Sequence, residues 1–447
     1  MTENVHEEPT HEEPTHEEPT HEAPTHEAPI ELLRPEKVAS KPTISLHLLV
    51  KNGGGVVGRL LDNVGPYIDE VSAVLNDTTD DTKQILTERS ARHGLLFSCR
   101  EVTAKSNPEH YILDTEESYR IGQSLVGEEY KGSFTEDMML VDWSAVRNLS
   151  HRGHCDWTLF LDADDVVADP ECLPGLCALL GERGHDLATS VYHYRRNLVG
   201  QVAGSAFRER LFRNVPYITW TEKIHEYPFG ATRPVHIDGN LIVTDMKDSQ
   251  GAGLRIPDRN FKTLYYHARR LGWEATRPRN LLYLGMEAKG TMPALADRVL
   301  ALYLERTHKS NRMEERAWAM CMRGEIDELA GRFSHASNRY REALKEHPGA
   351  KAAYRLCRSA YKDGDWKTVV DAYDLGVSHE GRVQLYDDGS VYRDASKILV
   401  AESLLRLGRN QEALALCKEA VVAFPQNEAL KRLHGRISKI CSVKEGP

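Results

Sequence analysis

The sequence lacks long apolar runs. Although 40% of its 447 residues are hydrophobic, no stretch approaches the roughly 18 to 20 uninterrupted apolar residues that a membrane-spanning helix requires. The N-terminus also lacks the basic segment followed by an apolar segment that marks a secretory signal. These absences predict a soluble protein with no membrane span.

Paired cysteines are also missing. No two cysteines form a Cys-x-x-Cys pair, and none has a histidine partner at zinc-finger spacing. Scattered thiols of this kind suit the reducing cytosol, so we expect a cytoplasmic protein. The eight cysteines are Cys99, Cys155, Cys172, Cys177, Cys321, Cys357, Cys417 and Cys441.

The chain has no excess of basic charge. Its 57 Lys and Arg residues stand against 67 Asp and Glu residues, for a formal net charge of −10. Residues 1–31 contain ten Glu and no Asp, Lys or Arg, so the rest of the chain is formally neutral. Because binding to nucleic-acid phosphates requires clustered Lys and Arg, this balance excludes a nucleic-acid-binding protein.

The N-terminal tail repeats a five-residue unit, His-Glu-(Glu/Ala)-Pro-Thr, over residues 6–29. Proline in every unit breaks helices, and the lack of apolar side chains leaves nothing to offset the entropy of ordering. We expect residues 1–42 to form a disordered tether and linker. Metal capture by the regularly spaced histidines is the alternative.

From residue 43 onward, short apolar segments alternate with segments of helical periodicity. This alternation predicts an α/β fold with a mostly parallel sheet and right-handed crossovers. Ligands bind at the carboxyl ends of such strands, so the polar sequences 53–55, 76–77 and 162–165 predict one ligand site. Strands are expected at 44–50, 71–75, 95–98 and 157–161, and helices at 56–64, 82–93 and 142–151.

Three carboxylates, Asp162, Asp164 and Asp165, follow the apolar segment 157–161. Carboxylates this close repel one another unless a cation or hydrogen bonds compensate. Their hard oxygen atoms suit Mg²⁺ or Mn²⁺ rather than zinc. The cluster therefore predicts a divalent metal site, and an aspartate turn that caps a helix is the alternative.

Helical periodicity continues from residue 260 to the end and includes a repeat of tetratricopeptide type. We predict an all-α domain over 260–447, in which small residues let paired helices approach closely. The two copies are offset by 77 residues, one 34-residue unit plus a 43-residue unit with an insertion at 378–392. The matching residues are Gly324, Gly331, Ala336, Tyr340, Ala343 and Pro348, and then Gly408, Ala413, Ala420 and Pro425.

The motifs of this chain, taken in the order in which they occur, resemble those of family two glycosyltransferases of the GT-A fold, in the branch with C-terminal tetratricopeptide repeats. The resemblance spans about residues 43–435 and is carried by Val50-Lys51-Asn52, Arg147-Asn148, Leu161 to Asp165, Arg210 to Arg213 and His225-Glu226. It implies an α/β GT-A (Rossmann-like) domain over 43–259. It also implies metal-dependent sugar transfer from a nucleotide-sugar donor, expected to be a UDP-sugar, with inversion.

The same resemblance implies roles for single residues on the donor side. Asp162 would touch the donor ribose or the metal, and Asp164 would coordinate Mn²⁺ or Mg²⁺. Lys51 and Asn52 would line the nucleotide pocket, with Asp77 supplying the carboxylate that many relatives place at the end of the second strand. Arg147, with Asn148 beside it, would add positive charge near the diphosphate. A surface position on its helix is the alternative for Arg147.

The acceptor side needs a carboxylate, because the attacking hydroxyl must lose a proton. Glu226 is the first candidate for this base, and Glu222 is the alternative. His225 is either a metal ligand, a support for one, or a packed core histidine. A third metal ligand is expected from Asp245 or Asp248.

The helical repeats suggest the partner. Tetratricopeptide arrays commonly hold peptide segments, so we expect a protein or peptide acceptor, with self-association through the repeats as the alternative. A second hypothesis for the whole chain is an interaction scaffold whose transferase domain is degenerate. A nucleotidyltransferase would need a basic, Gly-rich activation loop, which the sequence does not show.

Overall fold

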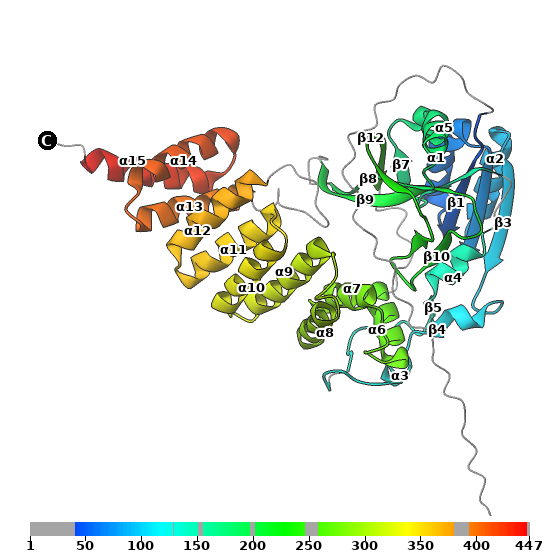
Figure 1. Ribbon diagram of the computed structural model, residues 1–447, viewed down its shortest axis with the longest axis horizontal. Helices are drawn as coiled ribbons and strands as arrows, with labels where there is room; N and C mark the ends of the chain where they lie inside the picture. Colours follow the sequence, from blue (N-terminus) through cyan, green and yellow to red (C-terminus); the bar gives the residue numbers. More distant parts are fainter. Residues whose placement is uncertain are drawn as a thin grey trace, which may run out of the picture.

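The computed structural model describes residues 41–127, 129–150, 155–196, 202–245, 258–379 and 393–444. Residues 1–40 of the predicted tail, Asp248 and most of the insertion at 378–392 lie outside these ranges. Within them, an α/β region comes first and a chain of paired helices follows (Figure 1). No helix in these ranges is long and apolar enough to cross a membrane.

Eight strands form one mixed, mostly parallel sheet in the order β3-β2-β1-β6-β9-β8-β12-β7. Strand β1 pairs in parallel with both β2 and β6, whereas β9 runs antiparallel to both of its neighbours. The predicted α/β sheet is thus confirmed. The strands are β1 (Ile44–Val50), β2 (Glu70–Asn76), β3 (Leu96–Val102), β6 (Trp157–Phe160), β7 (Asp165–Val167), β8 (Leu187–Arg196), β9 (Val202–Arg213) and β12 (Pro234–Asp245).

Helices α1 and α2 connect the first three strands. Helix α1 buries Val57, Leu60, Leu61 and Val64 completely, at the spacing that places them on one helical face against the sheet. Strand β3 runs four residues further than the predicted 95–98, through the charged pair Arg100-Glu101. This is allowed because β3 is an edge strand that pairs only with β2. The helices of this region are α1 (Gly54–Val64), α2 (Thr82–Arg92), α3 (Glu116–Arg120), α4 (Trp143–Asn148) and α5 (Leu173–Glu182).

Two short hairpin-like pairs lie outside the large sheet: β4 (Tyr111–Leu113) with β5 (Met138–Leu140), and β10 (Thr219–Thr221) with β11 (Tyr227–Phe229). The β4–β5 segment packs on the first helix of the following region. Lys262 and Asp114 are both fully buried there, with 2.8 Å between Nζ and Oδ2. Side chains from both sides of residue 260 therefore share one hydrophobic core.

The helical region is built of antiparallel pairs, which confirms the predicted helical repeat. Gly331, Gly364 and Gly408 lie between successive paired helices with φ of 72°, 78° and 76°, a conformation that favours glycine. The helices are α6 (Arg259–Leu271), α7 (Pro278–Ala288), α8 (Pro293–Arg306), α9 (Met313–Leu329), α10 (Phe333–Glu346), α11 (Ala350–Asp363), α12 (Trp366–Ser378), α13 (Arg393–Arg406), α14 (Asn410–Ala423) and α15 (Glu428–Lys444).

Candidate functional site

The carboxyl ends of three neighbouring parallel strands, β2, β1 and β6, meet at one edge of the sheet. Asp77, Lys51 and Asp162 follow these strands within two residues. A Cβ atom on Gly53 would lie 3.7 Å from Cβ of Ala163, so the glycine turn after β1 adjoins the acidic turn after β6. The chain passes from β1 to β2 and β3 on one side and returns to β6 on the other, which makes this edge a topological switch point.

Backbone strain is concentrated in the predicted site residues. Of the six non-glycine residues with positive φ in the described ranges, four are predicted site residues: Asn52 (50°), Asp77 (44°), Glu222 (72°) and His225 (54°). Side chains other than glycine adopt this region at a cost, and such residues cluster at functional sites. The Asn52 side chain stabilises its turn by accepting a hydrogen bond from the Thr79 N–H at 2.8 Å.

The acid turn, residues 162–165, divides its carboxylates between the interior and the surface. Asp165 is fully buried, accepts the N–H of Asp162 at 2.9 Å, and lies 3.2 Å from Nη2 of Arg210. Burial raises the pKa of Asp165 to about 7, with Arg210 opposing this shift and the Asp162 charge adding to it. The Asp162 side chain is 45% exposed. Asp165 thus stabilises the turn from the interior, while the Asp162 side chain remains partly exposed to solvent.

The Arg-Leu-Phe-Arg motif supports the strand that leads into the acid turn. It belongs to β9, which pairs antiparallel with β6. The guanidinium of Arg210 lies 5.3 Å from the ring centroid of Phe160, and that of Arg213 lies 4.8 Å from that of Trp157. Stacking of arginines on aromatic rings fixes the position of β6 beneath the turn.

Arg147 connects the acid turn to the acceptor side. Its side chain is only 10% exposed, so it is not a surface helix arginine. Its Nε forms an ion pair with Oε1 of Glu226, and its Nη2 lies 3.8 Å from Oδ1 of Asp162. The guanidinium also lies over the rings of Phe160 and Trp220, at 4.3 and 5.1 Å from their centroids. One cation therefore contacts both predicted carboxylates.

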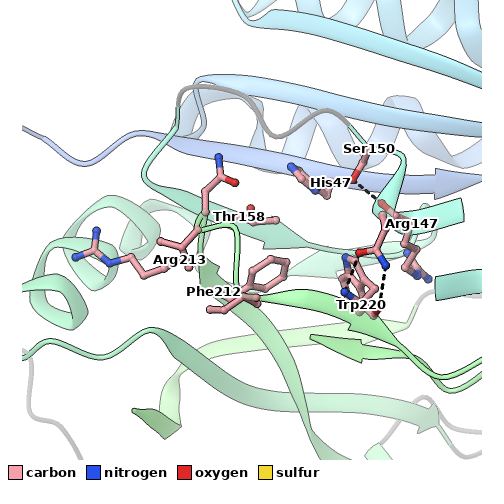
Figure 2. A pocket seen from close by; sticks show the side chains of 11 residues that line it. His47, Arg147, Ser150, Thr158, Phe212, Arg213 and Trp220 are labelled. Atoms are coloured by element: carbon pink, nitrogen blue, oxygen red, sulfur yellow. Dashed lines mark hydrogen bonds between the residues drawn. The ribbon is translucent and has the colours of Figure 1, made fainter. Parts of the chain in front are cut away.

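The Asn148 side chain anchors β10. Its Nδ2 donates to the carbonyl of Trp220 at 2.8 Å, and its Oδ1 accepts the Trp220 N–H at 2.9 Å. Figure 2 shows both bonds beside Arg147. This pairing fixes the start of the loop that continues to Glu226.

Two of the cavities lined by described residues border the sheet, and one of them includes two predicted nucleotide-side residues, Arg147 and Asn148. The cavity drawn in Figure 2, between Arg147, Trp220 and His47, has a volume of about 10 Å³, enough for one water molecule. A cavity of about 470 Å³ lies at the opposite, amino edge of the strands, next to Asp156 and Asp186. Neither of these two cavities is lined by a residue of the acid turn.

The second candidate base and the candidate histidine both face the helical region. The two carboxylate oxygens of Glu222 accept hydrogen bonds from Arg277 at 2.9 Å and from Asn280 at 2.8 Å. The ring of His225 stacks on that of Tyr283, with 4.1 Å between centroids. Burial lowers the pKa of His225, which favours its neutral form. No sequence motif indicated these partners from the helical region.

Three of the predicted metal ligands, Asp162, Asp164 and His225, have described side chains, and the His225 ring stacks on Tyr283. In these ranges no three His, Cys, Asp or Glu side chains come together in a way that could hold a metal ion. Asp245 is the last residue of β12 and pairs with Asp165 of β7, so the backbone of Asp245 lies beside the acid turn. Its side chain is not among those that the structure describes, and Asp248 lies outside the ranges given above.

Comparisons with known proteins find similarity among solved structures alone. No family model matches the chain, and no curated protein matches it. Among solved structures, the tetratricopeptide domain of Arabidopsis OM64 is similar at 18% identity and a TM-score of 0.25, over 28% of this chain and 98% of that one. PilF of Pseudomonas aeruginosa is similar at 13% identity and a TM-score of 0.31, over 39% of this chain and 73% of that one. MamA is similar at 17% identity and a TM-score of 0.30, over 36% of this chain and 86% of that one.

Proposed function

We propose that this chain is a metal-dependent glycosyltransferase of the GT-A kind. It moves a sugar from a nucleotide-sugar donor, with a UDP-sugar as first candidate, to a protein or peptide acceptor. The observation that carries the proposal is the position of Arg147. It contacts both Asp162 and Glu226 at the edge where three parallel strands end.

The residues of the acid turn fit a divalent cation. Asp162 and Asp164 are partly exposed carboxylates on one turn, and buried Asp165 supports that turn from below. Hard oxygen donors of this kind would hold Mn²⁺ or Mg²⁺. Such a cation, when bound, stabilises the negative charge that develops on a leaving nucleotide diphosphate. Arg147 adds a second positive charge on the same side.

We assign the remaining proposed roles to residues around this edge. Lys51, Asn52 and Asp77 lie where the nucleotide would enter, at the ends of β1 and β2. Glu226 is the proposed base, oriented by its ion pair with Arg147. The acceptor oxygen bonds to the anomeric carbon, the bond from that carbon to the diphosphate oxygen breaks, and the acceptor proton passes to Glu226. A single displacement of this kind inverts the anomeric centre.

Donor binding is the direct test. Calorimetry with a panel of nucleotide diphosphate sugars and Mn²⁺ should show binding by the wild-type chain, and released nucleotide should accompany transfer. Asp164→Asn should lose both properties. Asp169→Asn, an exposed aspartate on the same segment, serves as the matched control. If the wild-type chain binds none of the donors, the proposal is wrong.

A repeat scaffold with a degenerate transferase domain is the second candidate function. The observation that favours it is the set of helix pairs α9–α10, α11–α12 and α13–α14, each with a positive-φ glycine at its turn. Arrays of this type present extended binding surfaces. An Asp164→Ala variant that keeps the full biological effect of the chain would favour the scaffold. A variant that loses this effect but keeps its fold would favour the enzyme.

A further inference from the structure

One face of helix α7 lies against the acceptor-side loop, residues 222–226, which joins β10 to β11. Asn280, Tyr283 and Glu287 recur at intervals of three and four residues, so they share one face of the helix. Each of them contacts a residue of this loop that lies 58 to 62 residues earlier in the sequence. Figure 1 shows α6 and α7 next to the short elements below the sheet.

The first contact fixes Glu222. Asn280 Nδ2 donates to Oε2 of Glu222 at 2.8 Å, and Arg277, just before α7, donates to Oε1 at 2.9 Å. The Glu222 side chain is only 4% exposed, and its φ is 72°. Both of its oxygens are thus satisfied by groups from the helical region. These bonds compensate for a backbone conformation that is costly for a side chain other than glycine.

The second contact fixes His225, which directly precedes Glu226. Its ring stacks on Tyr283 with an interplanar angle of 17°, and its Nε2 lies 3.6 Å from Oε1 of Glu287. Glu287 is itself oriented by Asn260 Nδ2 at 3.1 Å. His225 also has positive φ, at 54°. Helix α7 therefore holds both strained residues of the loop.

We propose that Asn280, Tyr283 and Glu287 are positioning residues that hold the acceptor-side loop so that Glu226 meets Arg147. The helical region is then a structural part of the active site as well as a surface for partners. The catalytic meaning of this inference rests on the proposed function. The clamp, meaning the hold of Asn280, Tyr283 and Glu287 on the acceptor-side loop, rests on the observed contacts alone. The clamp and the proposed catalytic function can therefore be tested separately.

The test compares Asn280→Ala and Glu287→Gln with Asp297→Asn in the full chain. Asp297 is the matched control, because it joins neighbouring helices through Arg323 at 2.7 Å but has no contact with the loop. Hydrogen exchange of residues 221–227 should rise at least about tenfold in the two α7 variants and stay unchanged in the control. Donor affinity with Mn²⁺ should stay the same, while kcat for transfer falls roughly ten- to a hundredfold.

Several results would overturn the inference. Unchanged exchange of the loop in the α7 variants, or an equal rise in Asp297→Asn, would show that α7 does not hold the loop. Faster exchange with unchanged kcat would show that the clamp does not position Glu226. If the wild-type chain binds no donor, the proposed function falls, and the exchange measurement alone decides whether α7 holds the loop.

Discussion

Arg147 forms a buried ion pair with Glu226, 79 residues further along the chain. The two side chains are 10% and 9% exposed, so little solvent screens their interaction. Helix α4 supplies the cation, and the acceptor-side loop supplies the carboxylate. This pair connects the sheet edge that would bind the donor to the loop that α7 holds.

A double-mutant cycle should measure this pair. Arg147→Met leaves the Glu226 carboxylate buried without its cation and should lower the free energy of unfolding by about 3 to 5 kcal/mol. Adding Glu226→Gln should recover part of this loss, with a coupling energy of roughly 1 to 3 kcal/mol. Urea unfolding of the single and double variants gives both values. If the free-energy changes of the two single variants add up to that of the double variant within about 0.5 kcal/mol, the ion pair does not contribute to stability.

Close helix packing in the repeat region predicts a different response at two helical glycines. A Cβ atom on Gly324 would lie 2.7 Å from the ring of Tyr340, whereas one on Gly435 meets nothing within 4 Å. Gly324→Ala should therefore destabilise the chain by about 1 to 3 kcal/mol through overpacking. Gly435→Ala should stabilise it by about 0.5 to 1 kcal/mol, because alanine favours the helix. Thermal unfolding distinguishes these outcomes, and equal effects would contradict the packing.

Burial of His267 predicts a loss of stability in mild acid. Burial lowers the pKa of this histidine below its ordinary 6.5, although its Nε2–H bond to the Val141 carbonyl, at 2.8 Å, opposes the shift. Below about pH 6.5 the unfolded chain binds a proton that the folded chain excludes, so the free energy of unfolding falls as pH falls. The slope from one such histidine reaches about 1.4 kcal/mol per pH unit.

The substitution His267→Gln keeps a hydrogen-bond donor and should flatten this pH dependence. His308→Gln, at an exposed histidine, is the control. Urea unfolding between pH 5 and pH 8 provides the measurement, with both limits being about 1.5 units from the ordinary histidine value. An unchanged slope in His267→Gln would assign the acid sensitivity to other groups.

The strands beneath the site could be predicted because they are buried on both faces. Ile44–Val50 and Trp157–Phe160 read as short apolar runs, and the structure places both within one residue of the prediction. The three long strands between residues 187 and 245 were not predicted. Register shifts in their pairing, such as that between Ala188 and Thr189, interrupt the alternation that would mark a strand.

The donor edge of the site could be predicted from the sequence, whereas the clamp on the acceptor-side loop could not. Polar residues directly after apolar strands identify the edge, since neighbouring parallel strands end together. Asn280, Tyr283 and Glu287 instead have the spacing of a buried helix face, and their partner Glu222 lies 58 residues before Asn280. The available signal was a pair of polar side chains, Asn280 and Glu287, on that face.

Asp162 should separate metal binding from stability. Its side chain is 45% exposed and 3.8 Å from Arg147, so this ion pair is screened by solvent. Asp162→Asn should change the free energy of unfolding by less than about 1 kcal/mol. The same variant replaces a charged carboxylate ligand with a neutral amide and should weaken Mn²⁺-dependent donor binding at least about tenfold. Calorimetry with and without a chelator tests this, because the difference in donor affinity between the variant and the wild type should vanish once Mn²⁺ is removed. Donor affinity equal to wild type in Mn²⁺ would place the cation elsewhere.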